Sequence, residues 1–215
     1  MDVQTKPIGK SVLAFAALIV GANVIAVSDG LPLPGAGMAD VAAFFGSSPA
    51  AALSSALVPL AWLAATVFGA GAVAALWHAE RVWALVGFAG VLLQNATFAA
   101  IVATRLALTT VADDALWALH NGFFALNGTF LAIAMIGFSA GGVRAGLIRP
   151  WHAYLGYTAA ALQFASATLA FAVVDGQLGF VGLAGWVLWV GWLVAYGVVL
   201  LRGSGRRVDA AQPAA

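Results

Sequence analysis

The chain has 215 residues, of which 63% are hydrophobic and only 8% are charged, and its mean hydropathy is +1.01. Soluble domains are typically about 45–50% apolar and about 25% charged. The composition therefore excludes a soluble globular domain and predicts an integral membrane protein, because a bilayer solvates apolar surface without a hydration cost. The chain has no cysteine, which excludes disulfides and cysteine-ligated metals. The net charge of +1 indicates no partner, and nucleic acid is not expected.

The predicted fold class is all-α, a polytopic helical bundle with about six transmembrane helices. Each span needs about 20 mostly apolar residues. The expected spans cover residues 11–27, 51–77, 82–104, 114–139, 153–174 and 180–201. They form a single domain over 11–201, between a cytoplasmic N-terminus over 1–10 and a cytoplasmic tail over 202–215 that we expect to be disordered. The first segment also fits a signal peptide cleaved near residue 28, which would leave five spans.

The first loop, over residues 28–50, is the longest. Two prolines and two glycines, Pro32, Pro34, Gly35 and Gly37, break regular structure there. Residues 39–45 are expected to form a short helix in the membrane interface.

Pro59 lies inside the second expected span. It removes one backbone hydrogen bond and predicts a kink. Either a kink that serves packing or a hinge that shapes a cavity fits this position.

The basic residues predict the orientation. Eight of the nine fall on one side of a six-span bundle: Lys6, Lys10, Arg81, Arg144, Arg149, Arg202, Arg206 and Arg207. Only Arg105 falls on the other side, where the loops carry Asp29, Asp40, Asp113, Asp114 and Asp175. Positive charge is retained in the cytoplasm during insertion. Both termini are therefore predicted to be cytoplasmic.

Polar side chains deep in the expected spans are the candidate ligand-binding residues: His120, Asn127, Gln94, Asn95 and Gln163. An unpaired amide in hydrocarbon costs roughly 2–7 kcal/mol, so these groups should face one another or a polar pocket. We expect at least two of the amides to meet at mid-depth. Hydrogen bonds between helices and a small polar pocket are both consistent with this pattern.

His120 is the only readily titratable side chain expected well inside the hydrocarbon. Such residues are functional candidates by default, although a neutral imidazole bonded to an amide, such as that of Asn121, explains it equally. His78 and His152 are expected at inner helix ends, in contact with solvent.

Glycines and aromatic residues in the expected spans are read mainly as packing features. Gly87 and Gly90 are expected to allow close helix contact. Trp186, Trp189 and Trp192 wind around the last span, where they either pack against lipid and bundle or form the wall of an apolar ligand site.

No catalytic residues are assigned, and neither a cofactor nor a metal is expected. No Asp or Glu is expected at mid-membrane, which argues against proton-coupled pumps, and motifs of zinc proteases, nucleophile elbows and phosphate loops are lacking. Whether the protein is an enzyme is left open, with a non-enzyme favoured.

The loop and helix that read Gly-Leu-Ile-Arg-Pro-Trp-His-Ala-Tyr-Leu-Gly, over residues 146–156, resemble a family of small bacterial multi-span membrane proteins. This family is the domain of unknown function 4386. The resemblance covers roughly residues 11–201 and implies a similar length, span count and long first outer loop. It implies no catalytic residues.

Three functions are carried forward. The first is a non-catalytic membrane protein that binds a lipid or small hydrophobic ligand, or that accompanies a membrane partner or a second copy of itself. The second is a small-solute transporter or channel, and the third is a membrane enzyme that uses His120. Abundant Ala, Gly, Val and Arg with only two lysines indicates a high-GC bacterial genome, and hence the cell inner (plasma) membrane.

Overall fold

A computed structural model describes residues 5–174 and 178–203 as helices joined by turns, with no strand among them. The predicted all-α class is therefore confirmed. The elements are α1 (Thr5–Ser28), α2 (Met38–Ser47), α3 (Pro49–Ala56), α4 (Val58–Leu76), α5 (Arg81–Leu108), α6 (Asp114–Arg144), α7 (Pro150–Thr168), α8 (Ala170–Val174) and α9 (Gly179–Gly203). Asp175, Arg206, Arg207 and the tail over 204–215 lie outside the described residues.

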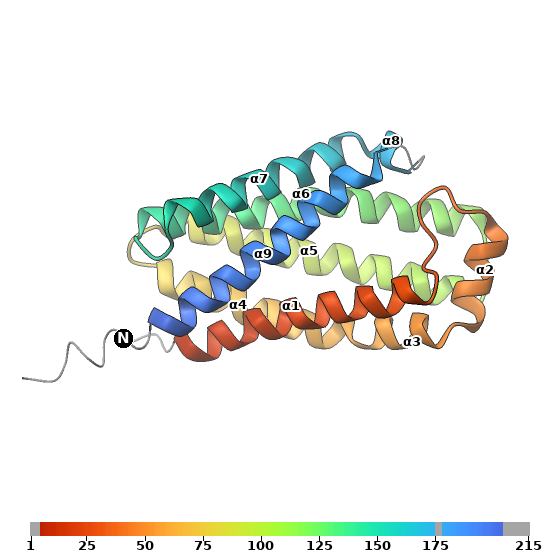
Figure 1. The fold of residues 1–215 in the computed structure, drawn as a ribbon, viewed down its shortest axis with the longest axis horizontal. Helices are drawn as coiled ribbons and strands as arrows, with labels where there is room; N and C mark the ends of the chain where they lie inside the picture. The colour runs from red at the N-terminus through yellow and green to blue at the C-terminus, as the bar shows by residue number, and fades with distance from the viewer. Residues whose placement is uncertain (1–4, 175–177, 204–215) are drawn as a thin grey trace, which may run out of the picture.

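Five helical segments in the described ranges are long and apolar enough to cross a membrane: α1, α3 with α4, α5, α6 and α9. The protein is therefore a multi-pass α-helical membrane protein. The sixth expected span corresponds to α7, which runs beside α6 and α9 and is extended by α8 (Figure 1). It does not meet the same criteria of length and composition. Its polar residues His152, Gln163 and Ser166 are buried inside the bundle.

Helix α6 is the central element of the bundle. It packs against α5 on one side and α7 on the other, while α9 lies against α7 and α1, and α1 lies against α4 (Figure 1). Backbones of α5 and α6 touch at small residues: a Cβ added at Gly90 would lie 2.3 Å from the Ala134 nitrogen, and one at Gly137 would lie 2.2 Å from the Gly87 nitrogen. The prediction that Gly87 and Gly90 serve helix packing is confirmed.

The second expected span is broken at Leu57, two residues before Pro59. The Leu57 N–H still bonds to carbonyls of the preceding turn, and α4 begins at Val58 with Pro59 in its first turn. Pro59 has no N–H to donate, so the predicted kink is found as a break between α3 and α4. Because Leu57 and Val58 both line a cavity, the break shapes that cavity.

The predicted helix of the first loop is α2. Its buried residues Val41, Phe44 and Phe45 form a small cluster with Leu108 of α5 and Trp117 of α6. The helix therefore packs on the end of the bundle, near the turn that joins α5 to α6 (Figure 1).

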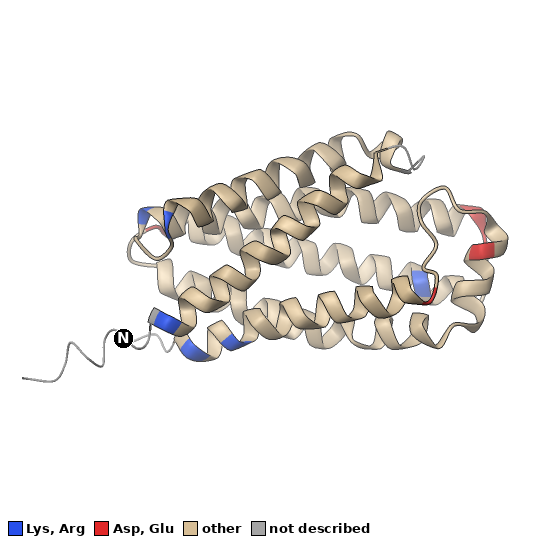
Figure 2. Cartoon of the chain, in the orientation of Figure 1, with Lys and Arg blue, Asp and Glu red and all other residues tan. Residues whose placement is uncertain are grey.

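Charges of opposite sign gather at opposite ends of the bundle (Figure 2). Lys6 and Lys10 lie in the first turns of α1, and Arg202 lies in the last turn of α9. The acidic segments lie mainly at the end that carries α2. Below, we call the end with the lysines the basic end and the end with α2 the acidic end.

Candidate functional site

The partly buried Arg105 and the buried His120 form a polar pair near the acidic end. The Arg105 Nε–H donates to His120 Nε2 across 3.1 Å. Both residues lie in the helical turns next to the same hairpin, since α5 ends at Leu108 and α6 begins at Asp114. Asp113 caps α6 by accepting from the N–H groups of Ala115 and Leu116. This cap fixes where α6 starts.

The hydrogen bonds assign the protonation of His120. A guanidinium only donates, so Nε2 must be the acceptor and the ring proton must be on Nδ1. That nitrogen lies 3.2 Å from Asn121 Oδ1, to which it donates. The sequence offered this bond as one of two interpretations of His120. The ring stacks on Trp117 at 4.9 Å between centroids and is 4% exposed. His120 is therefore neutral, and both of its nitrogens are engaged.

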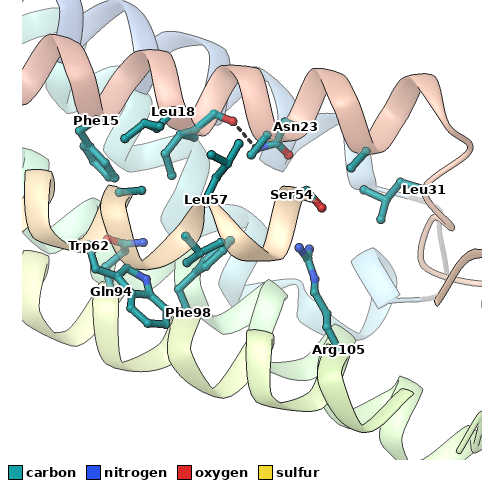
Figure 3. A pocket seen from close by; sticks show the side chains of 15 residues that line it. Phe15, Leu18, Asn23, Leu31, Ser54, Leu57, Trp62, Gln94, Phe98 and Arg105 are labelled. Carbon is teal, nitrogen blue, oxygen red and sulfur yellow. Dashed lines mark hydrogen bonds between the residues drawn. The ribbon is translucent and has the colours of Figure 1, made fainter. Parts of the chain in front are cut away.

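A narrow cavity lies between α1, α3, α4 and α5 (Figure 3). It begins beside Phe15 and extends to Arg105 and Leu31. The ring centroids of Phe15 and of Trp189 on α9 are 5.7 Å apart. The unfilled volume of the cavity is about 30 Å³, room for about two water molecules. Most of the lining is apolar. The polar side chains in it are Asn23, Ser54, Trp62, Gln94 and Arg105.

Arg105 is the only charged residue that lines this cavity. Its guanidinium extends from α5 toward Ser54 of α3 (Figure 3). The Nε–H bonds to His120, and the Phe98 ring centroid lies 6.0 Å from Cζ. Over residues 5–174 and 178–203, the one ion pair is Arg144 with Glu80, at the basic end. Arg105 thus has no acidic counter-ion in the part of the chain that the structure describes.

The five predicted ligand-binding residues occupy different environments. Gln94 lines the cavity, and His120 bonds to a residue that lines it. Asn95 donates to Thr66 Oγ1 across 3.1 Å.

The other two amides lie away from the cavity. Gln163 donates to the Gly182 carbonyl across 3.2 Å, and Asn127 Oδ1 is buried without a partner. Within the described ranges no hydrogen bond joins any two of Gln94, Asn95, Asn127 and Gln163. The expected meeting of amides is therefore not found as a hydrogen bond.

Sequence reasoning missed Arg105 as a site residue. It was assigned to the outer side, where its charge would be solvated, but its side chain is directed into the bundle. A signal was present, because Arg105 is the one basic residue outside the set that the sequence predicts to be cytoplasmic. It also flanks the same hairpin as His120. Ser54 and Asn23 lie within two of the expected spans, but nothing in the sequence links them to Arg105.

The basic end holds a second buried histidine, and here the expectation was wrong. His152 was expected in solvent, but it is completely buried and its Nε2 bonds to the Trp192 carbonyl across 3.0 Å. The Trp192 Nε1–H donates to Ser139 Oγ across 3.0 Å, and Trp192 and Tyr196 pack against Phe68. The helix start at Pro150 points His152 inward. His78, in contrast, is exposed, as predicted.

The tryptophans of α9 take the packing role. Trp189 and Trp192 are buried in the main apolar core, and Trp186 packs against it. None of the three lines the cavity beside Arg105.

In comparisons with known proteins, no family model, curated protein or solved structure matches the chain.

Proposed function

We propose that the protein is a non-catalytic membrane protein that binds a lipid or a small hydrophobic molecule in the cavity between α1, α3, α4 and α5. The observation that carries this proposal is the cavity itself, a narrow and mostly apolar space that contains one charged group at its acidic end. Apolar pockets with a few convergent polar groups are the usual form of small-molecule sites.

The shape of the cavity favours an elongated ligand. Gln94 and Arg105 both line it and are eleven residues apart on α5, which corresponds to about 16 Å along the helix axis. The hydrocarbon core of a bilayer is about 30 Å thick. The lining therefore extends over about one leaflet, the depth that a single acyl chain occupies.

The ligand must displace side chains to enter, because the unfilled volume is small. The wall formed by Leu57 and Val58 is suited to such movement, since it lies at the break between α3 and α4. Across the cavity from this wall, α1 and α9 diverge toward the acidic end (Figure 1). A Cβ added at Gly21 of α1 would meet nothing within 4 Å. At Gly21, α1 therefore has a face that no other described helix covers.

The other two functions have less support. An enzyme that uses His120 needs a free ring nitrogen beside a void, whereas both nitrogens are engaged and His120 does not line the cavity. A transporter needs a water path past Asn127 and Gln163, and neither residue lines the cavity. An accessory role beside a membrane partner remains compatible with ligand binding.

The proposed topology counts α7 as the sixth span and places both termini in the cytoplasm of a bacterial cell, with the protein in the inner membrane. The gathering of lysines and arginines at the basic end supports this orientation (Figure 2). Single cysteines at the exposed residues His78 and Val111 would test it. An impermeant thiol reagent added to intact cells should label position 111 and spare position 78. Labelling of position 78 alone would reverse the orientation.

Filling the cavity tests ligand binding. Ala22 lines the cavity from α1, whereas the adjacent Gly21 does not line it and faces open space. We expect Ala22→Phe to lower binding of a neutral probe, dodecanol, by about tenfold, as measured by native mass spectrometry in a neutral detergent. Gly21→Phe is the matched control and should bind dodecanol as the wild type does. Equal binding by all three proteins would refute this cavity as the site.

A further inference from the structure

We propose that Arg105 binds the anionic head group of an amphipathic ligand, a carboxylate or a phosphate that carries an apolar chain. This inference rests on the proposed function and specifies the chemical class of the ligand. It assigns the head group to the acidic end of the cavity and the chain to the apolar part between Arg105 and Phe15.

The first support is the hydrogen-bonding capacity of Arg105. A guanidinium has five N–H donors in a planar fork, and only the Nε–H has a partner among the described residues. The terminal nitrogens point into the cavity (Figure 3). Two N–H groups presented side by side match the paired oxygens of a carboxylate or a phosphate.

The second support is the absence of a compensating charge. An uncompensated cation inside a membrane protein is costly, and its bonded neighbour His120 is neutral. Asp113 caps α6, and Asp29 bonds to the Ser48 hydroxyl. No aspartate or glutamate lines the cavity. An anionic ligand would supply the charge that the described protein lacks at this position.

The third support is that two polar side chains of the lining bond to backbone carbonyls of their own helices. The Ser54 hydroxyl donates to the Ala51 carbonyl, and the Asn23 amide donates to the Ile19 carbonyl. The Trp62 Nε1–H also lines the cavity without a partner, but it lies beside Gln94, away from Arg105 (Figure 3). At the acidic end the free donors are therefore mainly those of Arg105, which favours an anion over a neutral polar head there.

The aromatic rings packed on His120 favour an amphiphile over a free anion as the ligand. Phe45 of α2 approaches the His120 ring at 6.3 Å between centroids, and Trp117 stacks on it. These rings cover His120 from the acidic end, where water-soluble ions would arrive. The guanidinium faces the apolar cavity instead, so a ligand that arrives from the bilayer reaches it more directly.

His120 acts in this scheme as a positioning residue. Its Nε2 accepts from Arg105 Nε–H, and its own ring is fixed by Asn121 and by stacking on Trp117. The bond orients the fork so that both terminal nitrogens remain available to the ligand.

Four probes test the inference on the full-length protein in a neutral detergent, with binding measured by native mass spectrometry: dodecanoate, dodecyl phosphate, dodecanol and inorganic phosphate. Charge-assisted bonds are roughly twice as strong as neutral ones. We therefore expect both anionic amphiphiles to bind at least about tenfold more tightly than dodecanol. Inorganic phosphate should bind far more weakly than dodecyl phosphate.

Variants assign the effect to Arg105. Arg105→Gln should abolish the preference for anionic probes over dodecanol, and Arg105→Lys should retain part of the preference because it keeps the charge without the fork. Arg144→Gln is the matched control, because Arg144 is exposed and paired at the basic end; it should retain the full preference.

His120→Ala should lower the preference severalfold, and His120→Gln, which restores an acceptor, should recover it.

The outcomes separate the two proposals. Equal binding of dodecanoate, dodecyl phosphate and dodecanol by the wild type would overturn the anionic head group and leave the apolar cavity in place. Arg105-dependent binding of inorganic phosphate as tight as that of dodecyl phosphate would overturn the amphiphile in favour of a free anion. Failure of all three dodecyl probes to bind would refute the proposed function itself.

Discussion

The two ends of the bundle each contain a buried histidine, and the two sites differ in what surrounds the ring. At the basic end, His152 bonds to a backbone carbonyl and lies among Trp192, Tyr196 and other core residues. At the acidic end, His120 bonds to a cation that lines a cavity. A buried histidine alone therefore indicates neither packing nor binding. The bonded partner, and the space beside that partner, distinguish the two roles.

The difference extends along the whole of α6. In its half near the basic end, Gly137, Gly141 and Gly142 all face atoms of neighbouring helices at less than 3.4 Å from an added Cβ. In the other half, an added Cβ at Gly122 would meet nothing within 4 Å, although one at Gly128 would lie 2.6 Å from the Gln163 carbonyl oxygen. We infer that the half of α6 near the basic end is closely packed on all of these faces, whereas the half near the acidic end leaves at least the face at Gly122 uncovered.

The largest effect is expected from Trp192→Ala. Trp192 is 1% exposed, and its indole N–H bonds to Ser139 Oγ. Removing a buried aromatic side chain typically costs about 3–5 kcal/mol, so the free energy of unfolding in mixed micelles should fall by that amount. Trp151→Ala, at a position that is 56% exposed, is the control and should change it by less than about 1 kcal/mol. Similar losses in both variants would contradict a stabilising basic end.

A smaller effect is expected from Gly137→Ala. The new Cβ would meet the Gly87 backbone at 2.2 Å, and a backbone cannot move aside as a flexible side chain can. Overpacking of this kind costs typically about 1–3 kcal/mol. Gly122→Ala places the same methyl group in open space on the same helix and should be neutral or slightly stabilising. If the two variants unfold at the same denaturant concentration, the two halves of α6 do not differ in packing.

Much of the fold could be predicted because its causes are local. Runs of apolar residues specify the long helices, Pro59 specifies the break before α4, and small residues such as Gly90 specify close helix contacts. The weakest expectation was the span around α7. Its polar side chains, among them Gln163, lower its hydropathy, and they are tolerated because α6 and α9 cover them.

The candidate site was less predictable because its key contact links two helices. The sequence indicates that polar groups lie deep in the bundle, and it offers Asn121 as one of several candidate partners of His120. It does not indicate which way a long side chain such as Arg105 points, because the choice between solvent and cavity depends on packing around the hairpin. The same limit applies to His152, whose burial depends on contacts with α9. The family resemblance stays a prediction.

A double-mutant cycle of Arg105 and His120 should show a still smaller net change in the free energy of unfolding. Arg105→Met alone leaves the buried His120 acceptor unpaired, and His120→Phe alone leaves the cation without its partner. Each should cost about 1–3 kcal/mol. The combined variant replaces both partners with apolar groups, which is often nearly neutral or stabilising. Unfolding in mixed micelles should therefore show a double variant close to the wild type. A double variant that loses the sum of both single costs would mean that the pair does not interact.

The smallest effect is expected from cysteine labelling in the middle of the bundle, between the two ends compared above. Asn127 and Gln163 are each 6% exposed, and neither lines the cavity beside Arg105. The chain has no cysteine, so single cysteines at these two positions can be read without background. We expect no labelling by a small water-soluble thiol reagent from either side of the membrane, and complete labelling at the exposed Val111. Labelling at 127 and 163 would indicate a water path through the bundle. It would favour the transporter over a ligand-binding protein, because such a path would connect the packed end to the end that holds the cavity.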